Sequence, residues 1–107
     1  MRFMMFVAED DHPDTDPAPG PDVDTWVADH DAAGRRLLGE VLEPAAGATT
    51  VRVRDGRTLV TTATVSGPIL GFDVLECADP HEAVAVAAAH PMARYGRIEL
   101  RAFAGPD

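Results

Sequence analysis

The sequence predicts an α+β domain in which an antiparallel sheet of the ferredoxin-like type carries two helices on one face. Three observations support this fold class. A strand–helix–strand pattern occupies residues 71–103, a second one occupies residues 2–42, and a β-hairpin lies between them. No linker interrupts these segments, so we expect a single domain over residues 1–107 with a short tail at 105–107.

The C-terminal unit has the clearest helix signals. Gly71–Cys77 is rich in apolar and β-compatible residues, which indicates a strand. Asp79 can cap a helix and Pro80 suits its first position, while the alanine-rich run that follows favours the helix itself. Pro91 lacks an N–H and stops this helix. Arg97–Phe103 then alternates polar and apolar residues, as a strand with one solvated face does.

The N-terminal unit begins with a strand and a long loop. Arg2–Ala8 is almost continuously apolar, which predicts a central strand covered on both faces. Residues 9–22 are so rich in proline and acids that they predict a solvated loop. The carboxylates beside His12 invite a metal interpretation, but their spacing fits no calcium-loop pattern, and such runs are usually exposed charge. We therefore expect no metal site.

The first helix should begin at Asp22 or Asp24 and run to about Ala33, with Gly34 as its C-terminal stop. At helical spacing one face carries Val23, Trp26, Val27, His30 and Ala33. His30 should therefore point towards the sheet, where a histidine is usually a packed, hydrogen-bonded core residue. It is also the best-placed catalytic candidate, because an imidazole in a partly dry site can titrate near neutrality.

The middle of the chain predicts a hairpin. The extended segment Arg35–Leu42 leads into small residues, after which Thr49–Arg54 and Arg57–Thr62 flank the two-residue turn Asp55-Gly56. A further reversal at Ser66-Gly67-Pro68 should lead into the next strand.

Arginines dominate one face of this hairpin. In the expected register Arg54 opposes Arg57 and Arg52 opposes Leu59, so the three arginines share a face. Like charges opposed across a hairpin repel unless something neutralises them. The arginines therefore either bind an anionic ligand or meet carboxylates of the protein itself or of a partner subunit.

Composition narrows the class of function. The formal net charge of −9 argues against nucleic acid and anionic membrane surfaces as partners, and no apolar run is long enough to span a bilayer. All nine basic residues are arginine, which excludes amine chemistry by a lysine. The sole cysteine, Cys77, cannot form an internal disulfide, so we expect a cytoplasmic protein.

The expected sheet has helices on one face only, so its other face needs a cover. Apolar residues occur on every expected strand, and a second copy of the chain is the simplest cover for them. We therefore expect a homodimer with the two sheets face to face.

Several stretches resemble the YCII-related superfamily, and within it the DGPF-domain group. The similar segments run in the same order through most of the chain: Met1–Phe6, Ala32–Gly34, Gly39–Pro44, Ala48–Gly56, Leu59–Thr61, Gly71–Ala83 and His90–Arg101. This resemblance implies a dimeric α+β barrel of the ferredoxin-like type. The Asp-Gly-Pro-Phe motif of the group is absent, and Thr62–Leu70 stands in its place. The early-helix histidine of the superfamily's acid/base dyad has no matching position here, since His30 lies further along the helix.

These observations lead to two main hypotheses of function. The first is a ligand-binding or regulatory dimer that holds a small anionic molecule in a cleft near the dimer interface, with Arg52, Arg54 and Trp26 as ligand contacts. The alternative is a cofactor-independent lyase or isomerase in which His30 is the general acid/base and Asp10 orients its imidazole. A purely structural dimer is a third possibility. The sequence has no phosphate-binding glycine loop and no cysteine–histidine metal spacing, so neither a cofactor nor a metal is expected.

Overall fold

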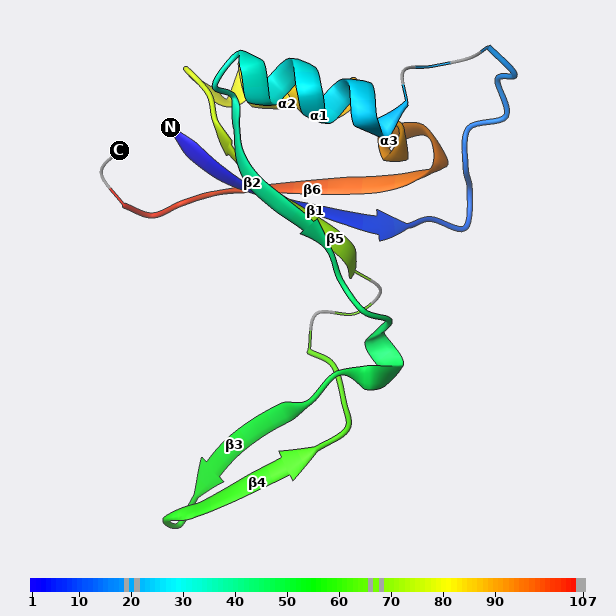
Figure 1. The fold of residues 1–107 in the computed structure, drawn as a ribbon. Coiled ribbons are helices and arrows are strands. Elements are labelled where there is room, and N and C mark those ends of the chain that lie inside the picture. Colours follow the sequence, from blue (N-terminus) through cyan, green and yellow to red (C-terminus); the bar gives the residue numbers. More distant parts are fainter. Residues whose placement is uncertain (19, 21, 66, 68, 106–107) are drawn as a thin grey trace.

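The computed structural model describes residues 1–18, 20, 22–65, 67 and 69–105 (Figure 1). Its elements in chain order are β1 (Arg2–Glu9), α1 (Val23–Ala32), β2 (Arg36–Val41), the 3₁₀ turn η1 (Ala45–Gly47), β3 (Thr50–Arg54), β4 (Arg57–Thr61), β5 (Ile69–Glu76), α2 (Pro80–Ala88), α3 (Met92–Tyr95) and β6 (Gly96–Ala102). In the described part of the chain, no helix is both long and apolar enough to cross a bilayer.

Four strands form the main sheet in the order β2-β5-β1-β6, and every neighbouring pair is antiparallel. The central strand β1 places Phe6 opposite Phe72 of β5 on one side and Glu99 of β6 on the other. Because α1 connects β1 to β2 and α2 lies between β5 and β6, this order is consistent with a ferredoxin-like α+β fold. The α+β class and the antiparallel sheet are confirmed, while the dimeric barrel stays a prediction.

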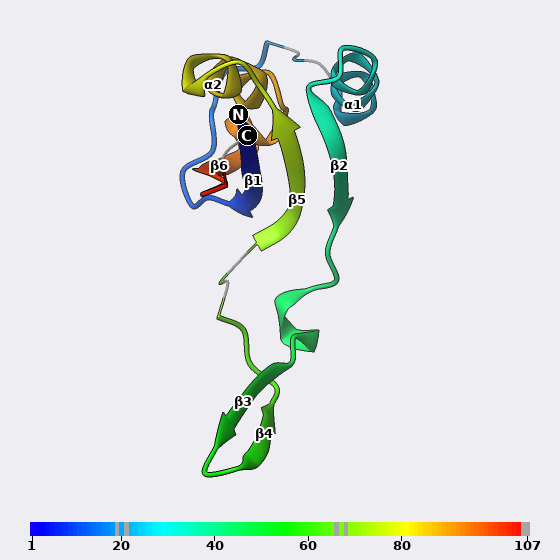
Figure 2. The same ribbon diagram turned by 90° about the vertical axis from the view of Figure 1, so that its left-hand side faces the viewer.

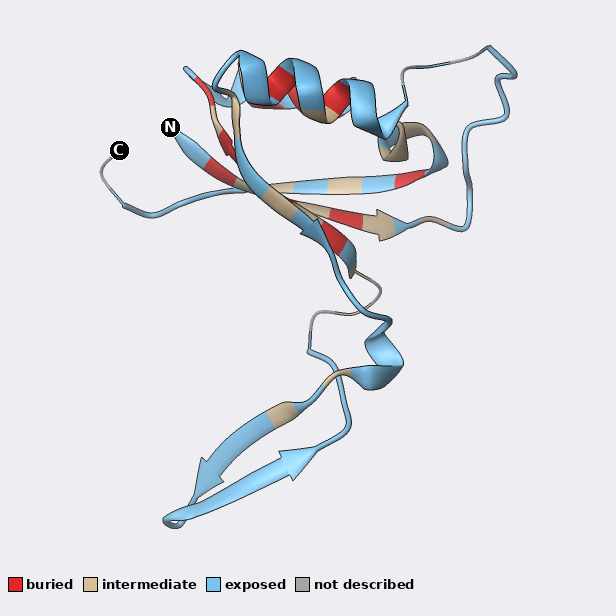
Figure 3. Cartoon of the chain, viewed as in Figure 1, coloured by how far each residue is buried: buried red, intermediate tan, exposed pale blue. Residues whose placement is uncertain are grey.

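The core lies between the helices and one face of this sheet (Figure 3). Phe3 and Met5 of β1 and Leu75 of β5 point to this face, since their positions alternate with half-buried neighbours along each strand. Trp26 of α1 is only 2% exposed, and its Nε1–H donates a hydrogen bond of 2.9 Å to the carbonyl oxygen of Val86 in α2. This bond ties the two helices together over the same sheet face.

The helix ends follow local signals in the sequence. The Asp22 side chain accepts a hydrogen bond from the Thr25 backbone N–H at the start of α1, and Asp79 does the same for Glu82 in α2. After α1, Gly34 adopts a left-handed φ of 73°, and the Arg35 N–H bonds back to the His30 carbonyl. Both predicted caps and the predicted glycine stop are thus confirmed.

Pro91 ends α2 as predicted, but the chain does not pass directly into a strand. Instead Pro91 precedes the short helix α3, because its fixed φ of −53° suits the start of a helical turn as well as the end of the previous one. The strand that precedes α2 also differs slightly from expectation, since β5 begins at Ile69, two residues before Gly71. In the turn expected at residues 66–68, Ser66 and Pro68 lie outside the described residues, and Gly67 has a left-handed φ of 66°.

The hairpin forms a separate two-stranded sheet, β3-β4, with the predicted register: Arg54 opposes Arg57 and Arg52 opposes Leu59. Its turn residues Asp55 and Gly56 have φ values of 52° and 74°, as a two-residue hairpin turn with two left-handed positions requires. Two perpendicular views show the hairpin standing away from the main sheet (Figures 1 and 2). We call residues 50–61 the arginine arm.

Candidate functional site

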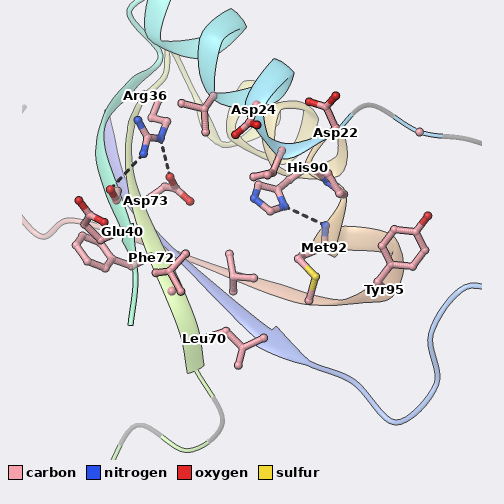
Figure 4. A pocket seen from close by; sticks show the side chains of 18 residues that line it. Asp22, Asp24, Arg36, Glu40, Leu70, Phe72, Asp73, His90, Met92 and Tyr95 are labelled. Atoms are coloured by element: carbon pink, nitrogen blue, oxygen red, sulfur yellow. Dashed lines mark hydrogen bonds and ion pairs between the residues drawn. The ribbon is translucent and has the colours of Figure 1, made fainter. Parts of the chain in front are cut away.

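A cleft of about 790 Å³ lies between the N-terminal half of α1, the helix α3 and the sheet (Figure 4). Its walls are mainly apolar and include Val7, Val27, Leu70 and Met92. A few polar side chains converge on it from β2, β5 and the α2–α3 junction. A concave, mostly apolar site with a small number of polar groups is the usual form of a small-molecule site.

The polar centre of the cleft is an ion pair across two strands. The Arg36 Nε of β2 lies 2.7 Å from an Asp73 carboxylate oxygen of β5, and Asp73 is only 6% exposed. Burial raises the pKa of Asp73, while the Arg36 guanidinium opposes that rise. Arg36 also donates to Asp31 at 3.0 Å and to the Gly39 carbonyl at 3.2 Å. Three of its nitrogens are therefore already used within the chain.

Gly39 makes room for this pair. It lies opposite Asp73 in the β2–β5 ladder, and a Cβ at this position would overlap an Asp73 carboxylate oxygen. The same Cβ would lie 2.7 Å from the Phe72 carbonyl oxygen and 2.8 Å from an Arg36 nitrogen. The absence of a side chain at Gly39 is thus what allows Arg36 to reach Asp73.

His90 contributes a second polar group from the α2–α3 junction. Its Nδ1 accepts a hydrogen bond of 3.0 Å from the Met92 backbone N–H, so the neutral ring carries its proton on Nε2. The side chain is buried, and burial lowers its pKa because the charged imidazolium loses solvation. His90 therefore offers the cleft a neutral hydrogen-bond donor.

Carboxylates surround the mouth of the cleft. Asp22 and Asp24 line it from the start of α1, and Glu40 lines it from β2 (Figure 4). The hydrogen bonds from Thr25 lower the pKa of Asp22, which keeps this carboxyl ionised. Among the described lining residues Arg36 alone is cationic. The cleft taken by itself is therefore acidic.

The acidic loop 9–22 is held beside this mouth. Arg94 of α3 pairs with Asp14 at 3.0 Å and donates to the carbonyl oxygens of Asp16 and Ala18 at 2.7 Å each. The described loop residues 11–18, 20 and 22 are exposed, as predicted, and these bonds hold the loop against α3 at Asp14, Asp16 and Ala18. In this way Arg94 helps to position Gly20 and Asp22, which both line the cleft.

The predicted residues of α1 lie behind the cleft, in the core. His30 is buried, and its Nδ1 accepts a hydrogen bond of 3.0 Å from the Arg35 Nε. Burial and the nearby Arg35 charge lower the pKa of His30. Trp26 packs between two imidazoles, with ring centroids 5.0 Å from His30 and 4.6 Å from His90. Neither Trp26 nor His30 belongs to the described residues that line the cleft.

The other predicted residues lie elsewhere on the chain. Asp10 accepts a hydrogen bond from the His12 backbone N–H and borders a smaller hollow of about 420 Å³ beside α2 and β6. Among the described residues no hydrogen bond joins Asp10 to His30. Arg52 and Arg54 lie on the arginine arm, which leads away from the sheet (Figure 1). The predicted site residues therefore do not lie together in a single chain, and their functional roles stay predictions.

Sequence reasoning did not single out Arg36, Asp73 or His90 as cleft residues. One signal for Asp73 was present, since it is an aspartate at an inward position of a buried strand, two residues before Leu75. Its partner could not be read from the sequence, because Arg36 lies on another strand. Within the described residues no group of histidine, cysteine, aspartate and glutamate side chains is arranged to hold a metal ion.

The fold and the cleft define a small α+β domain with a candidate ligand site between its first helix and its sheet. The family model of the YCII-related domain matches residues 1–103, and the chain belongs to this family. Membership of the DGPF-domain group stays a prediction. No curated protein matches the chain.

Proposed function

We propose that this YCII-related protein binds a small molecule in the cleft between α1 and the sheet, and that it does so as a homodimer. The observation that carries the proposal is the buried Arg36–Asp73 pair opening onto an apolar cleft of about 790 Å³. This volume lies within the range of roughly 300–1,000 Å³ that is usual for small-molecule sites. A buried ion pair is a costly feature, so its exposure to a cleft supports a role in recognition.

The polarity of the cleft indicates which part of a ligand it can hold. Asp73 supplies an acceptor, His90 Nε2–H and the Tyr95 hydroxyl supply donors, and the walls suit an apolar body. The Arg36 guanidinium is largely occupied by its own chain. The cleft of one chain, which is acidic, therefore disfavours an anionic ligand. The anionic ligand that the arginines suggest needs positive charge from outside this cleft.

The homodimer is supported by the sheet face that the helices leave uncovered. Met4, Phe6, Phe72 and Val74 are apolar, lie on this face and are only half-buried in the single chain. A second sheet packed against them would remove this surface from water.

A cytoplasmic location belongs to the same proposal, because Cys77 is a free, buried thiol.

A second candidate function is a cofactor-independent lyase or isomerase acting in the same cleft. The raised pKa of Asp73 favours it, since a buried carboxyl of this kind can exchange a proton with a bound substrate. In this version Asp73 would act where the sequence suggested His30, because His30 does not line the cleft. Chemical conversion of a bound compound, followed by mass spectrometry, separates catalysis from binding.

The test is a fragment screen by ligand-observed NMR with two matched variants. Val23 and Val84 are both exposed helical valines, but only Val23 lines the cleft. Val23→Trp should fill the cleft mouth and weaken the binding of fragment hits by about tenfold or more, whereas Val84→Trp should leave it unchanged. Hits that bind the Val23→Trp protein as well as they bind the wild type would refute the proposal, and so would a screen without hits.

A further inference from the structure

The arginine arm carries three charges that pair with no carboxylate of the described residues. Its residues 51–61 are all exposed (Figure 3). Among the described residues no ion pair joins Arg52, Arg54 or Arg57 to a carboxylate, and an Arg54 nitrogen instead donates to the neighbouring Val53 carbonyl. Arg54 and Arg57 also face each other across the hairpin. Like charges in this arrangement destabilise a strand pair.

The opposite face of the arm is apolar and equally uncovered. Val51, Val53 and Val60 share this face and are 58–62% exposed. A two-stranded hairpin with no packed face is at best marginally stable in water. The structure therefore presents a regular hairpin whose apolar face and charges both need a second surface.

The cleft mouth has the complementary composition. Val41 of β2 is 85% exposed there, and Val23 and Leu70 beside it are also open to solvent. Asp24 of α1 also lines the cleft, and Glu40, which lies opposite Phe72 in the β2–β5 ladder, stands on the other side of the edge strand β2. The arm carries three arginines and one aspartate, whereas the whole chain has a formal net charge of −9. An apolar centre with a charged rim is the usual anatomy of a protein interface.

The arm cannot serve its own cleft in this structure. It is connected to the C-terminal end of β2 and to the start of β5, whose residues Val41 and Leu70 line the cleft mouth. From there it leads away from the body, so the turn at Asp55-Gly56 is its far end (Figure 2). Each of its strands spans about 17 Å. A second copy related by twofold symmetry can accept this arm at its cleft, and its own arm then reaches the cleft of the first copy.

We propose that the arginine arm of one copy forms a roof over the cleft of a second copy. Its valine face packs on the exposed Val41 and Leu70 at the β2–β5 end of the cleft. Arg52 and Arg54 extend around the hairpin to Asp24 on the helix side of the sheet and to Glu40 on the other side of the edge strand β2. Long arginine stems allow such a reach. The inference rests on the proposed small-molecule site, which it completes with two cations from the partner. Those cations offset the carboxylates that line the cleft, so the shared cleft is less acidic than the cleft of one chain.

A reciprocal charge swap tests this arrangement. One variant carries Arg52→Glu and Arg54→Glu in the arm, and the other carries Asp24→Arg and Glu40→Arg at the rim. Asp22 is left unchanged because it caps α1. Sedimentation across a concentration series gives the Kd of self-association for each variant and for an equal mixture. Arg52→Lys with Arg54→Lys is the matched control, since it keeps the charge of the arm.

Each reversed variant alone should self-associate with a Kd raised by about tenfold or more, because like charges then meet at both contacts. In the mixture the reversed arm meets the reversed rim, and the second contact is wild-type, so the Kd should return to within about threefold of the wild-type value. The lysine control should match the wild type. Circular dichroism confirms that every variant is folded.

An unchanged Kd in either reversed variant would overturn the arm contact, and so would a mixture that fails to recover or a wild-type chain that is monomeric. None of these results shows whether a small molecule binds in the cleft, because that question is tested by the fragment screen with Val23→Trp. If fragments bind in the cleft while the charge swap has no effect, the site stands and the arm contact is rejected. If the charge swap behaves as expected and no fragment binds, the reverse holds.

Discussion

At the scale of single residues, Gly39 governs the centre of the cleft. A residue with a side chain at this position of β2 would collide with the Asp73 carboxylate and with the Phe72 carbonyl oxygen of β5. The Phe72 carbonyl belongs to the backbone of the paired strand and cannot move without disturbing the ladder. The space for the Arg36–Asp73 pair therefore depends on one missing methyl group.

We predict that Gly39→Ala lowers the free energy of unfolding by about 1–3 kcal/mol, the usual cost of inserting a methyl group into a packed region. Gly47→Ala is the control, because a Cβ at Gly47 meets no other atom within 4 Å. This control should stay within about 0.5 kcal/mol of the wild type. Urea unfolding of both variants measures the difference. Equal stability of the two would contradict the role assigned to Gly39.

Residues whose roles are local could be predicted from the sequence, and residues whose roles depend on strand pairing could not. The caps Asp22 and Asp79 and the stop Gly34 act within a few residues of their own positions, so their signals are legible in the chain. Arg36 and Asp73 are 37 positions apart and meet only because of the β2–β5 register. No local pattern reports such a contact.

At the scale of elements, α1 meets α2 and the α2–α3 junction through a cluster of three rings. Trp26 lies between His30 and His90, and its Nε1–H bonds to the α2 backbone. Both imidazoles use Nδ1 as an acceptor, His30 from Arg35 and His90 from the Met92 backbone. The contact between the helices thus requires two neutral histidines.

This ring cluster should make stability depend on pH. Burial lowers the pKa of both His30 and His90, and the Arg35 charge adds to the effect at His30. At pH values below the ordinary histidine pKa, these two histidines therefore bind protons more readily in the unfolded chain than in the folded chain. The stability is therefore complete above the ordinary histidine pKa of about 6.5 and is lost as the pH falls below it. The slope has an upper limit of about 1.4 kcal/mol per pH unit for each histidine.

Urea unfolding between pH 8 and pH 5 measures this dependence. The double variant His30→Gln, His90→Gln should show a flatter profile than the wild type. His12→Gln with His81→Gln is the matched control, since both of these histidines are exposed, and it should keep the wild-type slope. A wild-type stability that rises as the pH falls from 6.5 would contradict the interpretation that both histidines of the ring cluster are neutral. The raised pKa of Asp73 acts in the opposite direction, and it does so equally in the wild type and in both variants.

The strands, the two main helices and the hairpin were predictable because each has its own periodicity or turn signal. The helix α3 was not, because a proline that stops one helix can also start the next. The position of the arm was not predictable either. Its register follows from Asp55-Gly56, whereas its direction depends on the loops that join it to β2 and β5.

At the scale of the whole molecule, the arginines of the arm lie apart from the carboxylates of the loop and the cleft. The arm gathers three of the nine arginines, and the loop and cleft rim gather carboxylates at the start of α1. Within one chain these two regions stay separate (Figure 1). Such a distribution favours association between copies, since attraction between unlike charges then acts across an interface. The expectation from the sequence, that Arg52 and Arg54 lie near a cleft at the dimer interface, stays a prediction, and the proposed arm contact is the arrangement that would fulfil it.

The central claim is that the cleft between α1 and the sheet is the ligand site, and amide chemical-shift mapping tests it most directly. On titration with a fragment hit, the ¹H–¹⁵N signals of Val27, Gly39, Gly71 and Met92 should move together, because these residues line the cleft from four different elements. The amides around the smaller hollow, at Val84, Ala87 and Leu100, should stay in place. Shifts that gather at that hollow, with the four cleft amides unmoved, would contradict the account.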